Sequence, residues 1–147
     1  MAREHLVRAA EGRTIDLGVI RMRVLAAGEP TGRAFSLVEF QGEEGPWTVP
    51  HIHQHMEESF YVLDGTFTFT AGSDSIEAEP GTYLLVPRGT PHVMAAGPDG
   101  GRFLTLMVPG GMEEMFFELG SLPPDSLRDP EARAAISARY DSIPVTG

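Results

Sequence analysis

Glycine and proline divide most of this chain into short segments, and this punctuation restricts the possible folds more than any other feature. The chain has 17 glycines and 12 prolines in 147 residues, above the average usage of each. From residue 14 to residue 108 they separate short runs of alternating or clustered apolar residues, which favour strands over helices. About eight strands at this spacing predict an all-β sandwich or barrel. The expected strands are 20–24, 34–40, 47–53, 59–63, 66–70, 82–86, 91–95 and 102–108.

The pattern changes after Gly110 and Gly111. Apolar residues then recur at a helical spacing, which predicts a short amphipathic helix over 112–119. This helix could cover the barrel mouth as a lid, close a dimer, or pack on a sheet face. Asp129, Pro130 and Glu131 are typical of a helix start, and that helix should run to about Tyr140. We expect one domain over 1–147, with a β-barrel core at about 14–109 and a C-terminal helical appendage at about 110–147.

Composition excludes several classes of function. The chain has no cysteine, which excludes disulfides, thiolate nucleophiles and iron–sulfur sites. Eleven basic against 21 acidic residues leave a net charge of -10, so binding to nucleic acid or to an anionic membrane surface is disfavoured. The sequence has no signal-peptide core and no apolar run long enough to span a bilayer. We therefore expect a cytoplasmic protein whose chemistry depends on histidine and carboxylate groups.

Three of the five histidines lie close together at His51, His53 and His55, just before Glu57 and Glu58. Residues two apart on a strand share a face, about 6.6 Å from each other, so His51 and His53 could bind one metal ion. The alternative is a surface strand whose histidines face solvent. Strict alternation would place Glu58 on the opposite face unless the chain bends between 54 and 57. Spacing alone leaves open whether His55 or Glu58 completes the site.

A second cluster follows a glycine-led apolar strand. Pro87 and Gly89 form a Pro-x-Gly turn, and His92 begins the next expected strand. Considered alone, His92 is an ordinary polar residue after a turn, so its importance depends on what lies near it.

Together the two clusters resemble the two sequence motifs of the cupin superfamily. The first motif, G-x5-H-x-H-x3-4-E-x6-G, is matched by Gly45, His51, His53, Glu58 and Gly65. The second motif, G-x5-P-x-G-x2-H-x3-N, is matched by Gly81, Pro87, Gly89 and His92. Ala96 stands where the motif has asparagine, which is not a metal ligand. The motifs cover residues 45–96.

This resemblance implies a double-stranded β-helix, which is a small jelly-roll barrel. It further implies that His51, His53, Glu58 and His92 hold one divalent metal ion, with His55 and Glu57 outside the site. The ligand set suits Fe, Mn, Ni, Co or Zn and does not choose among them. A homodimer is also implied.

Within the superfamily, the chain is similar to single-domain quercetin-dioxygenase-like cupins of bacteria. That similarity implies O2-dependent cleavage of a flavonol-like, phenolic or enolic small molecule, with Glu58 as ligand and general base. The expected apolar substrate pocket comprises Phe60, Val62, Phe69, Met94 and Met107, with Phe67 and Trp47 as further candidates.

Two alternatives remain because one fold hosts many reactions. The first is a non-redox isomerase or lyase, in which Arg88 or Arg102 would meet an anionic substrate. The second is a cupin that binds a small molecule without catalysis.

Overall fold

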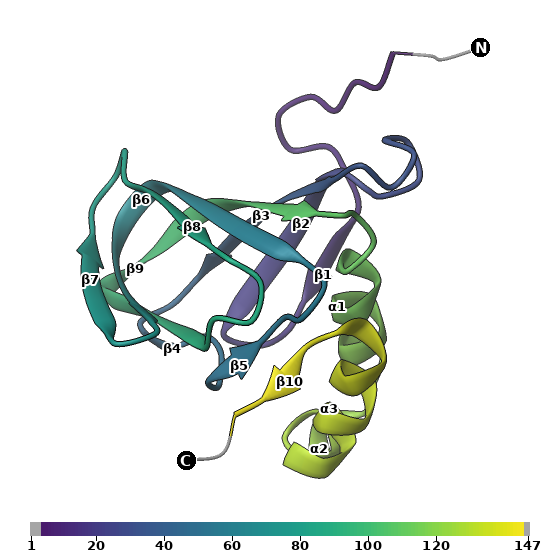
Figure 1. The fold of residues 1–147 in the computed structure, drawn as a ribbon. Helices are drawn as coiled ribbons and strands as arrows, with labels where there is room; N and C mark the ends of the chain where they lie inside the picture. Colours follow the sequence, from purple (N-terminus) through teal and green to yellow (C-terminus); the bar gives the residue numbers. More distant parts are fainter. Residues whose placement is uncertain (1–3, 146–147) are drawn as a thin grey trace.

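A computed structural model describes residues 4–145 and shows a β-barrel with short helices at one end (Figure 1). The elements, in chain order, are β1 (Thr14–Asp16), β2 (Ile20–Ala26), β3 (Ser36–Gly42), β4 (Gly45–Pro46), β5 (His51–Ile52), β6 (Glu57–Ala71), β7 (Asp74–Ala78), β8 (Tyr83–Val86), β9 (His92–Val108), α1 (Glu113–Gly120), α2 (Pro124–Leu127), α3 (Pro130–Ser137), the 3-10 turn η1 (Ala138–Tyr140) and β10 (Ile143–Pro144). The all-β prediction with C-terminal helices is confirmed.

Two long antiparallel strands, β6 and β9, form the frame of the barrel. They pair with each other from Glu57 opposite Val108 to Ala71 opposite His92. The other edge of β6 pairs with β7 and β8, and the other edge of β9 pairs with β3, β4 and β5. Because both strands extend along the whole barrel, they carry residues from one end of the molecule to the other.

Each long strand combines two segments that the glycine pattern predicted as separate strands. Residues 59–63 and 66–70 belong to β6, and residues 91–95 and 102–108 belong to β9. The pairing shifts register on both sides of Gly65, whose φ is +73°. A Cβ at Gly65 would lie 2.1 Å from the carbonyl oxygen of Gly100. Glycine here bends a continuous strand, as expected at a barrel corner, and does not end it.

An aromatic cluster fills the barrel. Phe60, Phe67 and Phe69 point inward from β6 and are almost fully buried. Their ring centroids lie between 4.9 and 5.9 Å from that of Phe103 on β9, distances typical of favourable aromatic pairs. Trp47 packs against Phe67 with a centroid separation of 5.0 Å. This packing gives the barrel an apolar interior next to the histidine-bearing end of β5.

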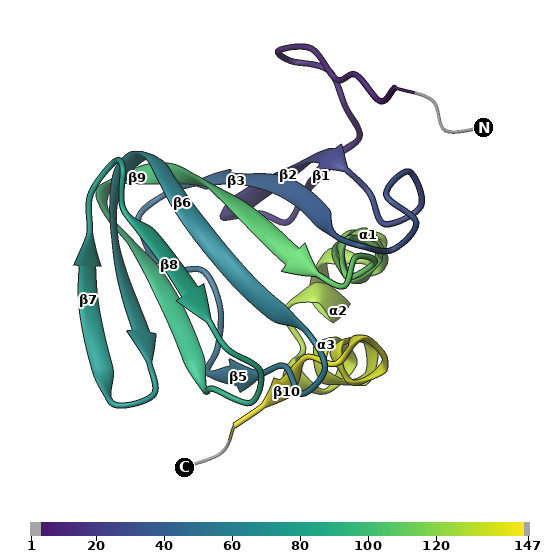
Figure 2. The same cartoon turned by 45° about the horizontal axis from the view of Figure 1, so that its top comes forward.

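The helices lie together at one end of the barrel (Figure 2). Helix α1 confirms the prediction from the apolar spacing of 112–119. Asp129 caps α3 by accepting a hydrogen bond from the backbone N–H of Glu131, at 3.1 Å, as the sequence predicted. The expected linker at 120–129 contains one extra turn, α2. The C-terminal chain then returns to the barrel, where β10 pairs with β5.

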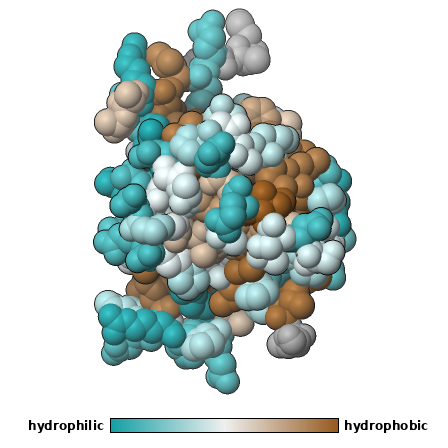
Figure 3. All heavy atoms as spheres, turned by 90° about the vertical axis from the view of Figure 1, so that its left-hand side faces the viewer, coloured by the Kyte–Doolittle hydropathy of each residue, from teal (hydrophilic) through white to brown (hydrophobic). Residues whose placement is uncertain are grey.

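The face of the barrel around β7 presents a mainly polar or neutral surface with apolar side chains toward one edge (Figure 3). The exposed large apolar side chains of strands β6, β8 and β9 are Tyr61, Tyr83, Leu85 and Leu106. Among residues 4–145, no helix is both long and apolar enough to cross a membrane.

Candidate metal centre

Four side chains converge inside the barrel, three of them on strands and one directly after β5. His51 lies on β5, His53 directly follows that strand, Glu58 lies on β6, and His92 begins β9. One donor atom from each residue can be chosen so that all four lie within 4.8 Å of one another. All four residues are buried. This is the set that the family resemblance implied.

A bend in the chain settles the alternation problem at Glu58. The strand β5 ends at Ile52, residues 54–55 form a bend, and β6 begins at Glu57. The bend turns Glu58 toward His51 and His53. His55 is exposed, and Glu57 faces Arg88 with a separation of 3.3 Å. Both residues therefore lie outside the cluster.

Backbone carbonyls hold all three imidazoles in one tautomer. The Nδ1 atom lies 2.7 Å from the Val49 oxygen in His51, 2.8 Å from the Asp141 oxygen in His53, and 3.0 Å from the Thr90 oxygen in His92. A carbonyl oxygen can only accept, so each Nδ1 carries the proton and donates it. In the neutral rings each Nε2 consequently offers a lone pair, which is the form that binds a metal ion.

The carboxylate of Glu58 lies among these imidazoles. Its Oε1 is 3.2 Å from His92 Nε2 and 3.4 Å from His53 Nε2. Burial alone would raise the pKa of Glu58, but the close approach of the His53 and His92 imidazoles to its carboxylate outweighs burial and lowers the pKa. Burial and the neighbouring His92 lower the pKa of His51 to about 4. For His53, burial opposes protonation, yet the adjacent Glu58 carboxylate raises its pKa. The group therefore holds a charged carboxylate beside a neutral His51.

The donor set fits a divalent metal ion. His53 Nε2 is buried and has no hydrogen-bond partner among the described residues, an uncommon situation for a buried polar atom. Three imidazole nitrogens and one carboxylate oxygen are ligands that Fe, Mn, Co, Ni and Zn accept. Coordination would satisfy the unpaired Nε2 and offset the negative charge of Glu58.

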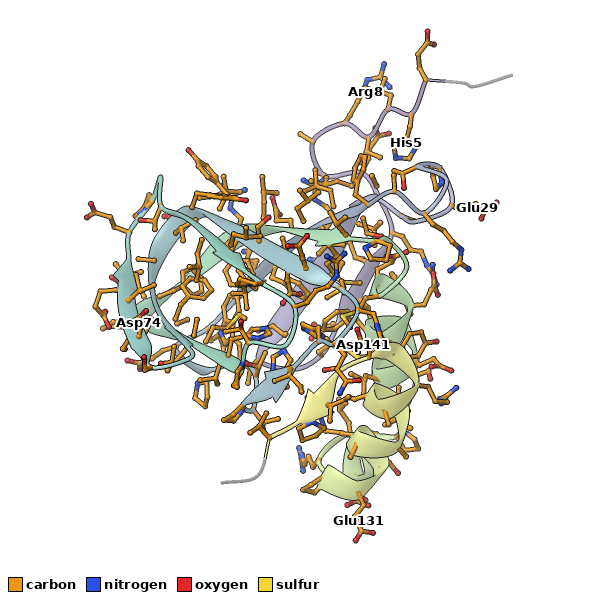
Figure 4. The ribbon with its side chains drawn as sticks, in the orientation of Figure 1. His5, Arg8, Glu29, Asp74, Glu131 and Asp141 are labelled. Atoms are coloured by element: carbon orange, nitrogen blue, oxygen red, sulfur yellow. The ribbon has the colours of Figure 1, made fainter. Side chains whose placement is uncertain are left out.

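Asp141 supports the cluster and was not predicted from the sequence. Besides its carbonyl contact with His53, its carboxylate accepts hydrogen bonds from the backbone N–H of Gln54 at 2.9 Å and of His55 at 2.7 Å. Figure 4 shows Asp141 between the C-terminal helices and the barrel. Nothing in the local sequence pairs this residue with the histidine motif, because the contact spans 86 to 88 positions.

A cavity of about 670 Å³ opens onto the cluster. Its walls include His51, His53 and Glu58, together with the expected Phe60, Met94 and Trp47. The other expected pocket residues do not line it and are buried in the core: Val62, Phe67, Phe69 and Met107. They face inward like Phe60, but Phe67 and Phe69 pack against Phe103, and Val62 and Met107 are enclosed by the barrel.

The C-terminal helices form the outer wall of this cavity. Met112, Met115, Phe116 and Leu119 of the α1 region line it, and so do Leu127, Arg128 and four residues of α3. The segment 112–119 thus covers the barrel opening, one of the roles that the sequence left open. Arg88 and Arg102 are not among the lining residues. Arg88 pairs with Glu57, and Arg102 lies 3.4 Å from Glu39.

Comparisons with known proteins agree with this geometry. A family model described as a cupin domain matches residues 36–109. The chain is 30% identical over 116 residues to a quercetin 2,3-dioxygenase of Bacillus subtilis, covering 79% of this chain and 34% of that protein. It is 31% identical over 144 residues to a quercetin 2,3-dioxygenase of Aspergillus japonicus, covering 91% of this chain and 39% of that protein. The chain thus spans little more than a third of the length of these curated relatives.

The fold is also similar to that of solved structures. KdgF from a Halomonas species superposes with a TM-score of 0.68 at 18% identity, covering 76% of this chain and 99% of that one. At this identity the similarity concerns the arrangement of strands and not the reaction.

Proposed function

Because the chain belongs to the cupin domain family, we propose that it is a metal-dependent dioxygenase acting on a flavonol-like, phenolic or enolic small molecule. The observation that carries this proposal is the buried His51, His53, Glu58 and His92 group at the inner end of an apolar cavity. Similarity to two quercetin 2,3-dioxygenases supports the choice of reaction. One divalent ion held by these four residues is part of the proposal.

The residues of the site have separate roles in binding the ion, accepting a proton and contacting the substrate. A bound divalent metal would supply Lewis acidity toward the substrate oxygen and redox chemistry toward O2. Glu58 would accept the proton of the substrate hydroxyl, because its carboxylate is ionised and lines the cavity beside the three imidazoles. Phe60, Met94 and Trp47 would contact the substrate body and exclude water from the reacting atoms.

The first prediction concerns Glu58. With metal-loaded protein, an O2 electrode should record O2 consumption that requires substrate, across a panel of flavonols, diketones and catechols. Glu58→Gln removes the proton acceptor and keeps an oxygen ligand, so kcat should fall roughly 100-fold or more while part of the metal content is retained. Glu57→Gln is the matched control, because Glu57 is the neighbouring carboxylate and pairs outward with Arg88; its rate should stay near that of the unmodified protein.

Two results would count against this proposal. If His51→Ala retained its full metal content in elemental analysis, the ligand set would be wrong. If metal-loaded protein consumed no O2 with any member of the panel, the dioxygenase assignment would be wrong. Turnover of a sugar or acid under strictly anaerobic conditions with zinc would instead identify a non-redox isomerase or lyase.

A further inference from the structure

We propose that the ligands of this cavity carry an acidic group, recognised by Arg128 and Arg133 at its outer end, in addition to the apolar body that the barrel walls contact. The inference rests on the proposed function in taking this cavity as the substrate site. Beyond the proposed function, the inference specifies that the substrate is negatively charged. The metal-binding residues do not determine that charge.

Half of the described arginines of this acidic protein lie beside carboxylates. All 11 basic residues are arginines, against 21 acidic residues. Among the described residues, five arginines lie within 4.0 Å of a carboxylate oxygen: Arg13, Arg23, Arg88, Arg102 and Arg139. Within the same part of the chain, five arginines have no such partner, and of these only Arg128 and Arg133 line the cavity. What sets Arg128 and Arg133 apart is that their unpaired charge lies at the cavity wall.

One face of α3 is turned toward the cavity. The lining residues of this helix are Pro130, Arg133, Ala134 and Ser137. Their spacing of three and four residues defines a single helix face. Arg133 is the one large residue on that face, and Arg128 reaches the cavity from the residue that caps α2. Both arginines are solvent-exposed, whereas the histidines are buried, so they mark opposite ends of the cavity.

Charge is unevenly distributed along the walls. Within the described chain, Glu58 is the single carboxylate that lines the cavity, and it lies in the metal group. The charged residues of the outer end are both guanidinium groups, which present hydrogen-bond donors suited to carboxylates and other oxyanions. A ligand whose oxygen binds in the histidine group could therefore place an acidic group near Arg128 and Arg133. The walls between these two ends are mainly apolar.

Two fluorescent probes that differ in one charge test this inference. Anilinonaphthalene sulfonate and phenylnaphthylamine share an apolar body, and only the first carries a sulfonate. The full chain would be loaded with zinc, which supports no redox turnover, and titrated with each probe at low salt. The net charge of -10 disfavours the sulfonate over most of the protein surface, so a preference for it reports local cations, which are the zinc ion or the two arginines. We expect the sulfonate to bind roughly fivefold more tightly than the neutral probe.

The double variant Arg128→Ala/Arg133→Ala should abolish this preference and leave the affinity for the neutral probe within about twofold. Arg8→Ala/Arg21→Ala is the matched control, because it removes the same charge from residues that neither line the cavity nor lie in ion pairs of the described chain. Figure 4 shows Arg8 on the N-terminal segment, far from α3. The control should retain the preference for the sulfonate.

The inference is overturned if the unmodified protein shows no preference for the sulfonate, or if both double variants reduce the preference equally. These outcomes are distinguishable from failure of the dioxygenase proposal, because they are read from binding alone. The sulfonate preference could depend on Arg128 and Arg133 in a protein that consumes no O2. That result would support the acidic ligand class and refute the dioxygenase reaction.

Discussion

At the scale of single residues, Asp141 connects the C-terminal segment to the histidine group. Its left-handed backbone, with φ of +61°, directs the carbonyl to His53 and the carboxylate to the bend at 54–55. Partners of this kind orient ligands and raise metal affinity. Aspartate adopts this backbone conformation more readily than most residues, which suits it to both contacts.

We predict that Asp141→Ala weakens metal binding by about 10-fold or more, because the bend that sets His53 relative to Glu58 loses two hydrogen bonds. Competition with a chromogenic chelator would measure the change in Kd. Asp125→Ala is the control, since Asp125 is exposed in α2 and should leave the Kd unchanged. An unaltered Kd in Asp141→Ala would show that the bend holds its shape without the carboxylate.

At the scale of elements, helix α1 is attached to the barrel through a buried carboxylate. Glu113 is 2% exposed. It accepts hydrogen bonds from the Ser36 hydroxyl, from the Gly28 N–H at 3.0 Å and from the Gly111 N–H at 3.1 Å. These donors come from three different segments, so one side chain fixes the start of α1 against β3 and the loop before it. This attachment keeps Met112 and Met115 in place as cavity walls.

Replacing Glu113 by alanine should lower the free energy of unfolding by about 2–4 kcal/mol, because buried donors would lose their acceptor. The neighbouring Glu114→Ala provides the comparison. Its pair with Arg13 is 2.8 Å long but exposed, so we expect a loss of no more than about 1 kcal/mol. Urea unfolding of both variants measures the difference. Equal losses would show that Glu113 adds nothing beyond a surface charge.

The sequence predicts the features that depend on local patterns, but not those that depend on contacts between distant residues. Local signals sufficed for the helix over 112–119, for the Asp129 cap and for most strand positions. Local signals did not predict that β6 continues through Gly65. Glycine is typical both of turns and of bent strands, so its presence alone does not tell the two apart. The four cluster residues were predictable because the family motifs preserve their spacing. Asp141, Glu113 and Arg133 were not, because their roles depend on contacts between distant parts of the chain.

At the scale of the whole molecule, the barrel and the C-terminal segment share one site. Strand β10 pairs with β5, placing Pro144 opposite His51, and the Val145 N–H donates to the Pro50 oxygen at 3.0 Å. Asp141 adds its contacts to His53 and the bend. A metal ion that binds His51 and His53 would therefore favour the docked form of the segment, and docking would favour metal binding, by reciprocal linkage.

Metal removal should show this coupling. Addition of metal at 100 times its Kd should stabilise the fold by about 2.7 kcal/mol, seen as a rise in Tm. Hydrogen exchange measured by mass spectrometry should slow in peptides that cover 50–56 and 141–145. Peptides from β7, which lies at the far side of the barrel from the helices (Figure 2), should change least. A rise in Tm without slower exchange in 141–145 would refute the coupling.

The carbonyl that accepts the hydrogen bond from His53 Nδ1–H is synthesised after the whole barrel. The ribosome produces the four cluster residues and the whole of β9 before it adds Asp141. A nascent barrel ending near Val108 would hold His53 with no acceptor for its Nδ1–H from Asp141, and with a free bend beside it. Its ring could then rotate or exchange tautomers. The metal affinity of the complete site therefore requires that translation has passed Asp141.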